Sequence, residues 1–417
     1  MPWGCGALEL GIPAALAGKV FLAQPRPLTP LADPAGAVLA AVASPVGTAP
    51  LAQQLRSAPH VLLIVSDPTR SVAYPQWLPA LLDFVRRHLP AGAQLTLLMA
   101  CGTHDAPPSE ATRSYLGVND EVLLHDSRDE ASLVHLGVST RGTPLTVNRL
   151  AVECDLIIAT GAVGYHYFAG FTGGVKALFP GLAGFASVVA NHSLCLDLNQ
   201  RLFAEGVAPG RLDGNPVHED FLEVLPHLPP VFLINTVLAE DRHPAYFAAG
   251  GITAAHREAC RFVDAHFRCE LPRPADLLLL SAGGHPRDIS LYQAHKALKH
   301  AEGALARRAR VLFFARCPQG MGHPYFDHWR ELDYGATMAL LRRGYQPVGH
   351  IALSLRLLAK RFDLNLVSEL DAATAEAWGF TPVPPDKAAV KAAWMLARAK
   401  SPVVVTHGSS LLLAAGQ

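Results

Sequence analysis

Four short segments of this sequence place histidine, lysine or arginine side chains next to glycine or proline. The segments are Ser66–Arg70, Gly102–His104, Gly161–Lys176 and Gly283–His285. An imidazole is the usual acid or base near neutral pH and a common metal ligand, and a guanidinium can hold a carboxylate through two parallel hydrogen bonds. Together these side chains could bind an anionic substrate and transfer protons.

The richest segment runs from Gly164 to His192 and contains His166, Lys176 and several glycines. Glycine lets backbone amides approach a ligand and form an anion-binding nest. A lysine after such a loop can bind an anion, or can react covalently if its pKa is lowered. Taken singly, each feature has an ordinary interpretation: a flexible turn with a solvated lysine, and histidines on the surface or in a hydrogen-bonded core.

Three further features follow the same logic. The turn Asp67–Arg70 offers the Arg70 guanidinium to a carboxylate or phosphate, although a turn capped by an aspartate is an equally simple interpretation. His104 ends the segment CGTH. Gln293 and Lys296 are three residues apart and share one face of a predicted helix, where a solvated surface is the usual outcome.

Short apolar runs precede these segments and predict buried strands. Strands are predicted at residues 61–66, 94–100, 155–160, 231–238, 276–281, 310–317 and 402–405, and helices at 75–89, 253–267 and 290–304. This alternation predicts an α/β fold with mostly parallel sheets covered by helices. Ligands bind beyond the carboxyl ends of strands in such sheets, which is where the four segments lie.

A chain of 417 residues is too long for one ordinary core, so we expect two domains with the active site in the cleft between them. Two prolines make Glu270–Asp276 the best candidate linker. It divides the chain into residues 1–270 and 271–417, although the last residues can return to the first domain. The first 55 residues are expected to form short irregular elements packed on the first domain.

The composition argues against several classes of protein. Lys plus Arg and Asp plus Glu both number 35, so the net charge is zero and nothing predicts binding to nucleic acid or to an anionic membrane. We find neither the roughly 18 apolar residues of a membrane helix nor the pattern of a signal peptide. Seven cysteines without a CxxC pair favour a reducing compartment, so we expect a cytoplasmic protein.

The motifs SDPTR, CGTH, GYHYFAGFTGGVKALFPG…NH and GGHPRDISLYQAHK occur together in this order. In combination they resemble the lactate racemase family, from about Pro45 through the second domain. His166 and Lys176 are ten residues apart, and Lys176 and His192 are sixteen apart; both separations match the family. The resemblance implies a nickel-pincer nucleotide, a pyridinium mononucleotide whose two sulfur-bearing arms hold nickel.

The resemblance also implies a role for each candidate residue. Lys176 joins the cofactor covalently, His192 ligates nickel, His104 and His166 are the acid and base on the two faces of the substrate, Asp67, Pro68, Thr69 and Arg70 surround the cofactor, and Arg70, Gln293 and Lys296 contact the substrate. Residues 1–270 then form the cofactor-binding domain, and residues 271–417 contribute substrate contacts.

The implied activity is racemisation or epimerisation of a 2-hydroxy acid. One histidine takes the hydroxyl proton, the Cα hydride moves to the pyridinium ring to leave a 2-keto acid, and return of the hydride to the opposite face inverts the centre. The implied partners are a small 2-hydroxy acid and the enzymes that synthesise and load the cofactor. The sequence leaves the oligomeric state open.

Three positions depart from the usual family pattern. Ser71 stands where proline is usual, Asp105 where a basic residue is common, and Thr172 where serine is usual. Asp105 changes the charge beside the predicted substrate pocket, so the substrate need not be lactate.

Two other functions remain open from the residues alone. The first is a zinc-dependent hydrolase or lyase that uses His104, His166 and His192, although no HExxH or comparable ligand motif is present. The second is a non-catalytic protein that binds the cofactor or a small acid, although both candidate bases and Lys176 are retained.

Overall fold

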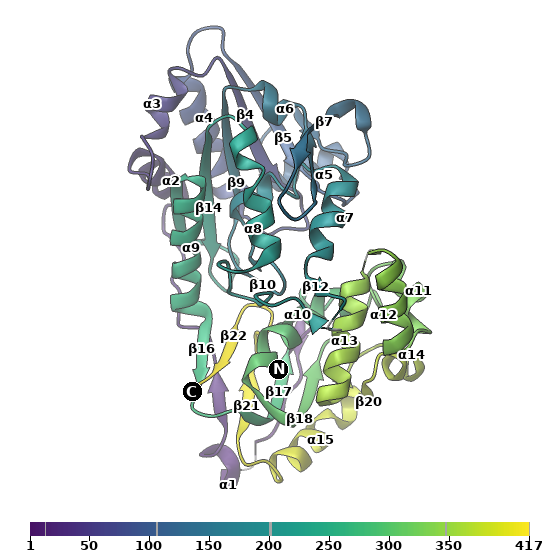
Figure 1. The fold of residues 1–417 in the computed structure, drawn as a ribbon. Coiled ribbons are helices and arrows are strands. Elements are labelled where there is room, and N and C mark those ends of the chain that lie inside the picture. The colour runs from purple at the N-terminus through teal and green to yellow at the C-terminus, as the bar shows by residue number, and fades with distance from the viewer. Residues whose placement is uncertain (13, 106, 200–201, 347, 417) are drawn as a thin grey trace.

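The structure, a computed structural model, describes residues 1–12, 14–105, 107–199, 202–346 and 348–416. Two six-stranded sheets, one above the other in Figure 1, organise these residues. Both sheets are largely parallel and flanked by helices, so the predicted α/β class is confirmed.

The first sheet has the strand order β15-β14-β9-β4-β5-β6. Its strands are β4 (His60–Ser66), β5 (Gln94–Ala100), β6 (Val122–Leu124), β9 (Leu156–Ala162), β14 (Val231–Leu238) and β15 (Pro244–Gly251). The pairings are parallel except that β15 runs antiparallel to β14. The five residues from Val61 to Val65 in β4 are all apolar and buried, as a strand covered on both faces requires.

Helices cover both faces of this sheet. Helices α2 (Pro34–Ala43), α3 (Leu51–Leu55) and α4 (Leu78–His88) pack on one face, and α9 (Ile252–Phe267) packs on the other. Alternate residues of β4 serve the two faces, since Leu63 packs with the α4 side and Leu62 with the α9 side.

The second sheet has the order β20-β19-β18-β17-β21-β3 and is parallel throughout. Its strands are β3 (Phe21–Ala23), β17 (Ala275–Ser281), β18 (Leu305–Phe314), β19 (Asp363–Val367), β20 (Thr381–Val383) and β21 (Pro402–Val405). Helices α10 (Leu291–Ala301) and α13 (Gly349–Arg361) pack on one face, and α15 (Ala388–Leu396) packs on the other.

The N-terminal segment corrects one expectation. Strand β3 pairs with β21 of the second sheet, whereas α2 and α3 pack on the first sheet as expected. The apolar strand β21 would otherwise present an open edge, and β3 satisfies its backbone groups. Near the other terminus, β22 (Leu412–Ala415) pairs with β16 (Arg268–Leu271), directly after α9 (Figure 1). The domain boundary at residue 270 stays a prediction.

The remaining elements are short. The strand pairs are β1 (Pro2–Trp3) with β2 (Gly6–Ala7), β7 (Leu133–Val138) with β8 (Pro144–Asn148), β10 (Tyr165–His166) with β11 (Gly170–Phe171), and β12 (Leu196–Asp197) with β13 (Leu202–Phe203). The other helices are α1 (Ala14–Ala17), α5 (Ser109–Leu116), α6 (Leu150–Glu153), α7 (Phe185–Ser193), α8 (Pro216–Leu222), α11 (Tyr325–Arg330), α12 (Tyr334–Arg343) and α14 (Ala372–Ala377). In the described part of the chain, no helix has the length and apolar character needed to cross a membrane.

Candidate active site

The predicted site residues meet where the first sheet faces the second. Strands β9, β4 and β5 are neighbours, so the loops that follow them leave the same edge of the sheet. Helix α10 of the second sheet also approaches this edge. Lys296 on this helix is close enough for its charge to act on the His166 ring, as the charges of Lys176 and Arg70 do. The structure therefore gathers side chains from four separate segments around one space.

His104 and Asp67 form a pair at the ends of β5 and β4. His104 Nδ1 lies 3.3 Å from Asp67 Oδ2 and 3.4 Å from Thr69 Oγ1, and the Thr69 amide donates to Asp67 Oδ1 at 2.8 Å. Burial alone would raise the pKa of Asp67, but the hydrogen bond with His104 and the charge of Arg70 outweigh it and lower the pKa to about 2. The ionised carboxylate thus fixes the orientation of the His104 ring.

The depressed pKa of Asp67 predicts a pH-dependent contribution to stability. The contribution is fully present above the ordinary value of 3.8 and is lost as the pH falls toward about 2. We expect Asp67→Asn to lose about 2 kcal/mol of unfolding free energy at pH 6. This loss should shrink between pH 4 and pH 2 in urea titrations. Asp83→Asn, at an exposed position, is the matched control, and a loss for Asp67→Asn of equal size at all pH values would contradict the assignment.

His166 lies in the β10–β11 hairpin. The Ala169 amide donates to His166 Nδ1 at 3.2 Å, which leaves Nε2 as the ring nitrogen that can meet a substrate. Burial and the neighbouring positive charges of Lys176 and Lys296 hold the pKa of His166 well below its ordinary value. The imidazole is therefore neutral near pH 7, as a proton acceptor must be.

Lys176 has the environment of a reactive amine. Its Nζ lies 4.7 Å from the ring centre of Phe221 and 5.7 Å from that of Phe168. Among the described residues, no carboxylate lies within ion-pair distance of this amine. Burial, with a smaller effect from Arg70, lowers the pKa of Lys176 to about 7. A substantial neutral fraction at pH 7 makes the amine nucleophilic.

Two glycines determine where Lys176 is placed. Gly173 and Gly174 have φ values of 75° and 60°, in the left-handed region that favours glycine. A Cβ on Gly174 would lie 2.5 Å from the ring of His256. The His256 ring in turn lies with Nε2 2.9 Å from the Thr172 carbonyl oxygen. A side chain at Gly174 would therefore displace the turn that carries Lys176.

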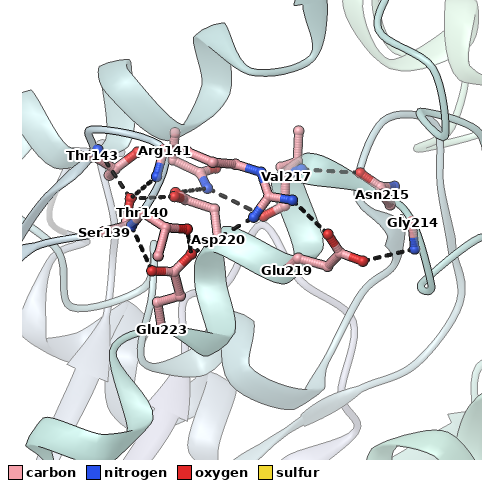
Figure 2. A network of polar contacts seen from close by, with 11 residues as sticks. Ser139, Thr140, Arg141, Thr143, Gly214, Asn215, Val217, Glu219, Asp220 and Glu223 are labelled. Atoms are coloured by element: carbon pink, nitrogen blue, oxygen red, sulfur yellow. Dashed lines mark hydrogen bonds and ion pairs between the residues drawn. The ribbon is translucent and has the colours of Figure 1, made fainter.

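His192 lies on α7, and a buried polar network holds that helix. The ring centres of His192 and Phe168 are 5.0 Å apart, and the charge of Lys176 acts on His192. The adjacent Asn191 side chain donates to Asp220 Oδ2 at 2.8 Å. Asp220 on α8 also accepts from the Ser139 hydroxyl at 2.5 Å, as Figure 2 shows. Since α8 also carries Phe221, this helix supports both His192 and Lys176.

This network predicts unequal costs for two substitutions. Asp220→Ala leaves the buried Ser139 hydroxyl without an acceptor and leaves the Asn191 amide with only the Val217 carbonyl, and we expect a loss of about 2–4 kcal/mol of unfolding free energy. Glu223→Ala removes the more exposed partner of Thr140 and Arg141 (Figure 2), and should cost less than about 1 kcal/mol. Urea unfolding measures both, and equal losses would contradict the role given to Asp220.

Gln293 and Lys296 share one face of α10, as predicted. Lys296 Nζ donates to Gln293 Oε1 at 2.7 Å and lies 5.7 Å from the ring centre of Tyr292. Burial and the charge of Arg70 lower the pKa of Lys296 to about 7. Within the described residues this amine also lacks a carboxylate partner, so a substrate carboxylate would complete its environment.

The second domain supplies residues that the sequence analysis missed. His350 on α13 has its Nε2 2.5 Å from the Tyr167 hydroxyl, and its Nδ1 bonds to the Tyr345 hydroxyl. The Tyr167 ring stacks on His166 with 5.3 Å between centres, so α13 reaches the neighbour of a candidate base. His323, in the loop after β18, is close enough for the charge of His104 to lower its pKa, after the larger effect of burial.

The three positions that depart from the family pattern differ in exposure and in hydrogen bonding. Ser71 and Asp105 are exposed. Thr172 keeps the hydroxyl that a serine would supply, since its Oγ1 donates to the Ala162 carbonyl at 2.8 Å and accepts from the Gly164 amide at 2.9 Å. The described part of the chain contains no group of three or more His, Cys, Asp or Glu side chains arranged to hold a metal ion.

Comparison with known proteins decides the family. The family model for the lactate racemase N-terminal domain matches residues 3–202, a range that includes all the first-domain candidates. The lactate racemase of Thermoanaerobacterium thermosaccharolyticum is 31% identical over 293 residues, covering 69% of this chain and 67% of that protein. The chain belongs to the lactate racemase family. The Lactiplantibacillus plantarum lactate racemase is 32% identical over 293 residues, covering 68% and 66%.

Solved structures show that the similarity of fold covers nearly the whole chain. The apoprotein of the Thermoanaerobacterium thermosaccharolyticum lactate racemase superposes with a TM-score of 0.88 at 26% identity and covers 99% of both chains. A Thermotoga maritima protein covers 92% of this chain and 99% of its own, with a TM-score of 0.70 at 19% identity; it shows the fold alone. As a lactate racemase family member, the chain is an isomerase of the racemase type.

Proposed function

We propose that this enzyme inverts the Cα of a small 2-hydroxy acid with the help of a nickel-pincer nucleotide. The observation that supports this most strongly is that five side chains surround one space. They are the imidazoles of His104 and His166, the Lys176 and Lys296 amines of lowered pKa, and the Arg70 guanidinium. Two acid/base groups suit inversion, because a proton must leave and return for substrates of either configuration. The unpaired cations suit an anionic substrate and cofactor.

The residues present fit such a cofactor. The Lys176 amine is buried, lacks a carboxylate partner among the described residues and has a pKa of about 7, so it is available for a covalent link. The neutral His192 ring beside it is a suitable donor to nickel. Asp67, Pro68, Thr69 and Arg70 would surround the nucleotide. When bound, the cofactor would supply a hydride acceptor for the substrate Cα.

The side chains of this enzyme would do the remaining work. Arg70 and Lys296 would hold the substrate carboxylate, with Gln293 fixing Lys296 through their hydrogen bond. His104, oriented by Asp67, and His166 would take the proton from the substrate hydroxyl and return it. The oxidised form of the substrate at the midpoint is a planar 2-keto acid, which can be reduced on either face.

The structure gives less support to the two other functions. A zinc hydrolase would need His104, His166 and His192 to converge, and among the described residues no such ligand group is formed. A non-catalytic binding protein would have no use for the Asp67–His104 pair, whose hydrogen bond orients an acid/base ring.

The substrate and cellular setting are parts of the same proposal. The exposed Asp105 carboxylate, where a basic residue is common, favours a less anionic or more hydroxylated acid than lactate. The cofactor would come from separate synthesis enzymes. All seven cysteines are free, which fits the reducing cytoplasm where we place the protein.

A screen of single enantiomers of 2-hydroxy acids would test the proposal. The enzyme is produced with the cofactor-synthesis enzymes, and chiral chromatography follows each acid. We expect interconversion of at least one pair, with about one nickel and no zinc per chain. Zinc without nickel, together with hydrolysis or elimination of an acid, would favour the zinc enzyme. Nickel loading without any interconversion would favour the binding protein.

A further inference from the structure

A chain of hydrogen bonds links the hairpin that carries His166 to a helix of the second sheet. Tyr167, the residue after His166, has its hydroxyl 2.5 Å from His350 Nε2, and His350 Nδ1 bonds to the Tyr345 hydroxyl. His350 lies in the first turn of α13, and Tyr345 lies in the loop before that helix. Tyr167 and His350 are both buried. The proposed chemistry gives no task to these three side chains.

The two bonds of His350 require one arrangement of protons. Burial lowers the pKa of His350 to about 3, so the ring is neutral near pH 7 and carries a single N–H group. One tyrosine hydroxyl therefore donates to the bare ring nitrogen, and the other accepts from the N–H group. Among the described residues, the Tyr167 hydroxyl has no other partner. Because an unpaired buried hydroxyl is unfavourable, this bond fixes the orientation of the Tyr167 ring.

The Tyr167 ring in turn forms one wall of the space that His166 occupies. The centres of the two rings lie 5.3 Å apart, with 11° between their planes. The Phe168 ring meets His166 edge-on, with 4.4 Å between centres. Within the described residues, the His166 ring has one hydrogen bond, from the Ala169 amide to Nδ1. One bond leaves the ring free to rock, so its aromatic neighbours restrict where Nε2 lies.

We propose that His350 is a positioning residue for His166 and acts through the Tyr167 ring. An acid/base group is effective only when it is held within about 0.5 Å of its productive position. The hairpin of His166 follows β9 of the first sheet, whereas α13 packs on the second sheet. The position of His166 would therefore depend on contact between the two domains. This inference rests on the proposed role of His166 as an acid/base group.

The kinetics of enzyme produced with the cofactor-synthesis enzymes test this role. Tyr167→Phe keeps the ring but removes the bond to His350, and it should lower kcat about 10- to 100-fold with little change in KM. His350→Gln should keep most of kcat, because its amide group reaches the position of Nε2. His350→Asn reaches only the position of Nδ1, and should lose as much as Tyr167→Phe.

Tyr165→Phe is the matched control for these variants. It removes a hydroxyl from the same hairpin, but this hydroxyl bonds to Asp264 on α9 of the first sheet at 2.6 Å. The control should leave kcat unchanged. A loss in Tyr165→Phe equal to that in Tyr167→Phe, or equal losses in the two His350 variants, would show a general weakening of the hairpin or helix and would overturn the proposal.

A double substitution separates positioning of His166 from any other effect on the rate. In a His166→Gln background, Tyr167→Phe should cause no further loss of kcat, because the ring that it positions is already absent. If Tyr167→Phe lowered kcat by the same factor in that background as in the wild type, Tyr167 would act on another group and the proposal would be wrong.

NMR of the cofactor-free chain with isotope-labelled histidine rings provides a readout that needs no activity. The His166 signals are identified by their absence in His166→Gln. They should shift or broaden in Tyr167→Phe and His350→Asn, and stay unchanged in Tyr165→Phe and His350→Gln. Unchanged signals in Tyr167→Phe would overturn the proposal. The expected signals without inversion of any 2-hydroxy acid would contradict the proposed function and leave the positioning of His166 intact.

Discussion

Replacing Lys176 by alanine is expected to abolish covalent attachment of the cofactor and reduce racemase activity to background. We propose this amine as the nucleophile, since burial lowers its pKa to about 7 and no carboxylate pairs with it among the described residues. Aromatic rings rather than carboxylates surround it. Intact-protein mass spectrometry of chains produced with the synthesis enzymes would detect the added mass on wild type and its absence on Lys176→Ala.

Lys296→Ala provides the matched control, because Lys296 has a similarly lowered pKa but lies on α10 in the second domain. This variant should keep the covalent mass and the nickel while its KM for the substrate rises. If Lys176→Ala retained the adduct, or if both lysine variants lost it equally, the assignment of the attachment site would be wrong.

Replacing either His104 or His166 by glutamine should lower the rate of racemisation by about 10²- to 10⁴-fold, the usual contribution of a positioned acid/base group. Nickel content should stay near that of the wild type, because neither ring is the proposed nickel donor. Both losses should be seen from either enantiomer, since the proposed inversion uses one histidine on each face of the substrate. Chiral chromatography for the rate and metal analysis for nickel measure the two effects.

His60→Gln is a suitable control for these variants. His60 is exposed and begins β4, at the end of the strand opposite the site, so its loss should leave both rate and nickel unchanged. A His104 or His166 variant that racemises at the wild-type rate would remove that residue from the two-base mechanism.

Much of the fold followed from local patterns. The continuous apolar run of β4 and the i, i+3, i+4 spacing of buried leucines in α4 specify their elements without help from distant residues. The rule that ligands lie beyond the carboxyl ends of parallel strands then predicted that Asp67, His104 and His166 lie at the same edge of the sheet. The convergence is seen in the structure, whereas the catalytic roles stay predictions.

Other features depended on contacts between distant segments. Strand β3 has three residues and acquires its structure by pairing with β21, nearly four hundred residues later. The hydrogen bond of Tyr167 with His350 joins two domains. Neither residue belongs to a pattern in the sequence that would predict this contact. His323 could have been found, because the segment GMGH follows β18 as the other candidate loops follow their strands.

The fate of a deuterium label at the substrate Cα tests the central claim most directly. The loaded enzyme is incubated in ordinary water with one enantiomer of its 2-hydroxy acid deuterated at Cα, and the inverted product is isolated. Inversion by hydride transfer predicts that the product keeps the deuterium, because the label never becomes a proton that exchanges with water. Loss of the label at the rate of inversion would show that the enzyme removes the Cα hydrogen as a proton, and would contradict the proposed mechanism.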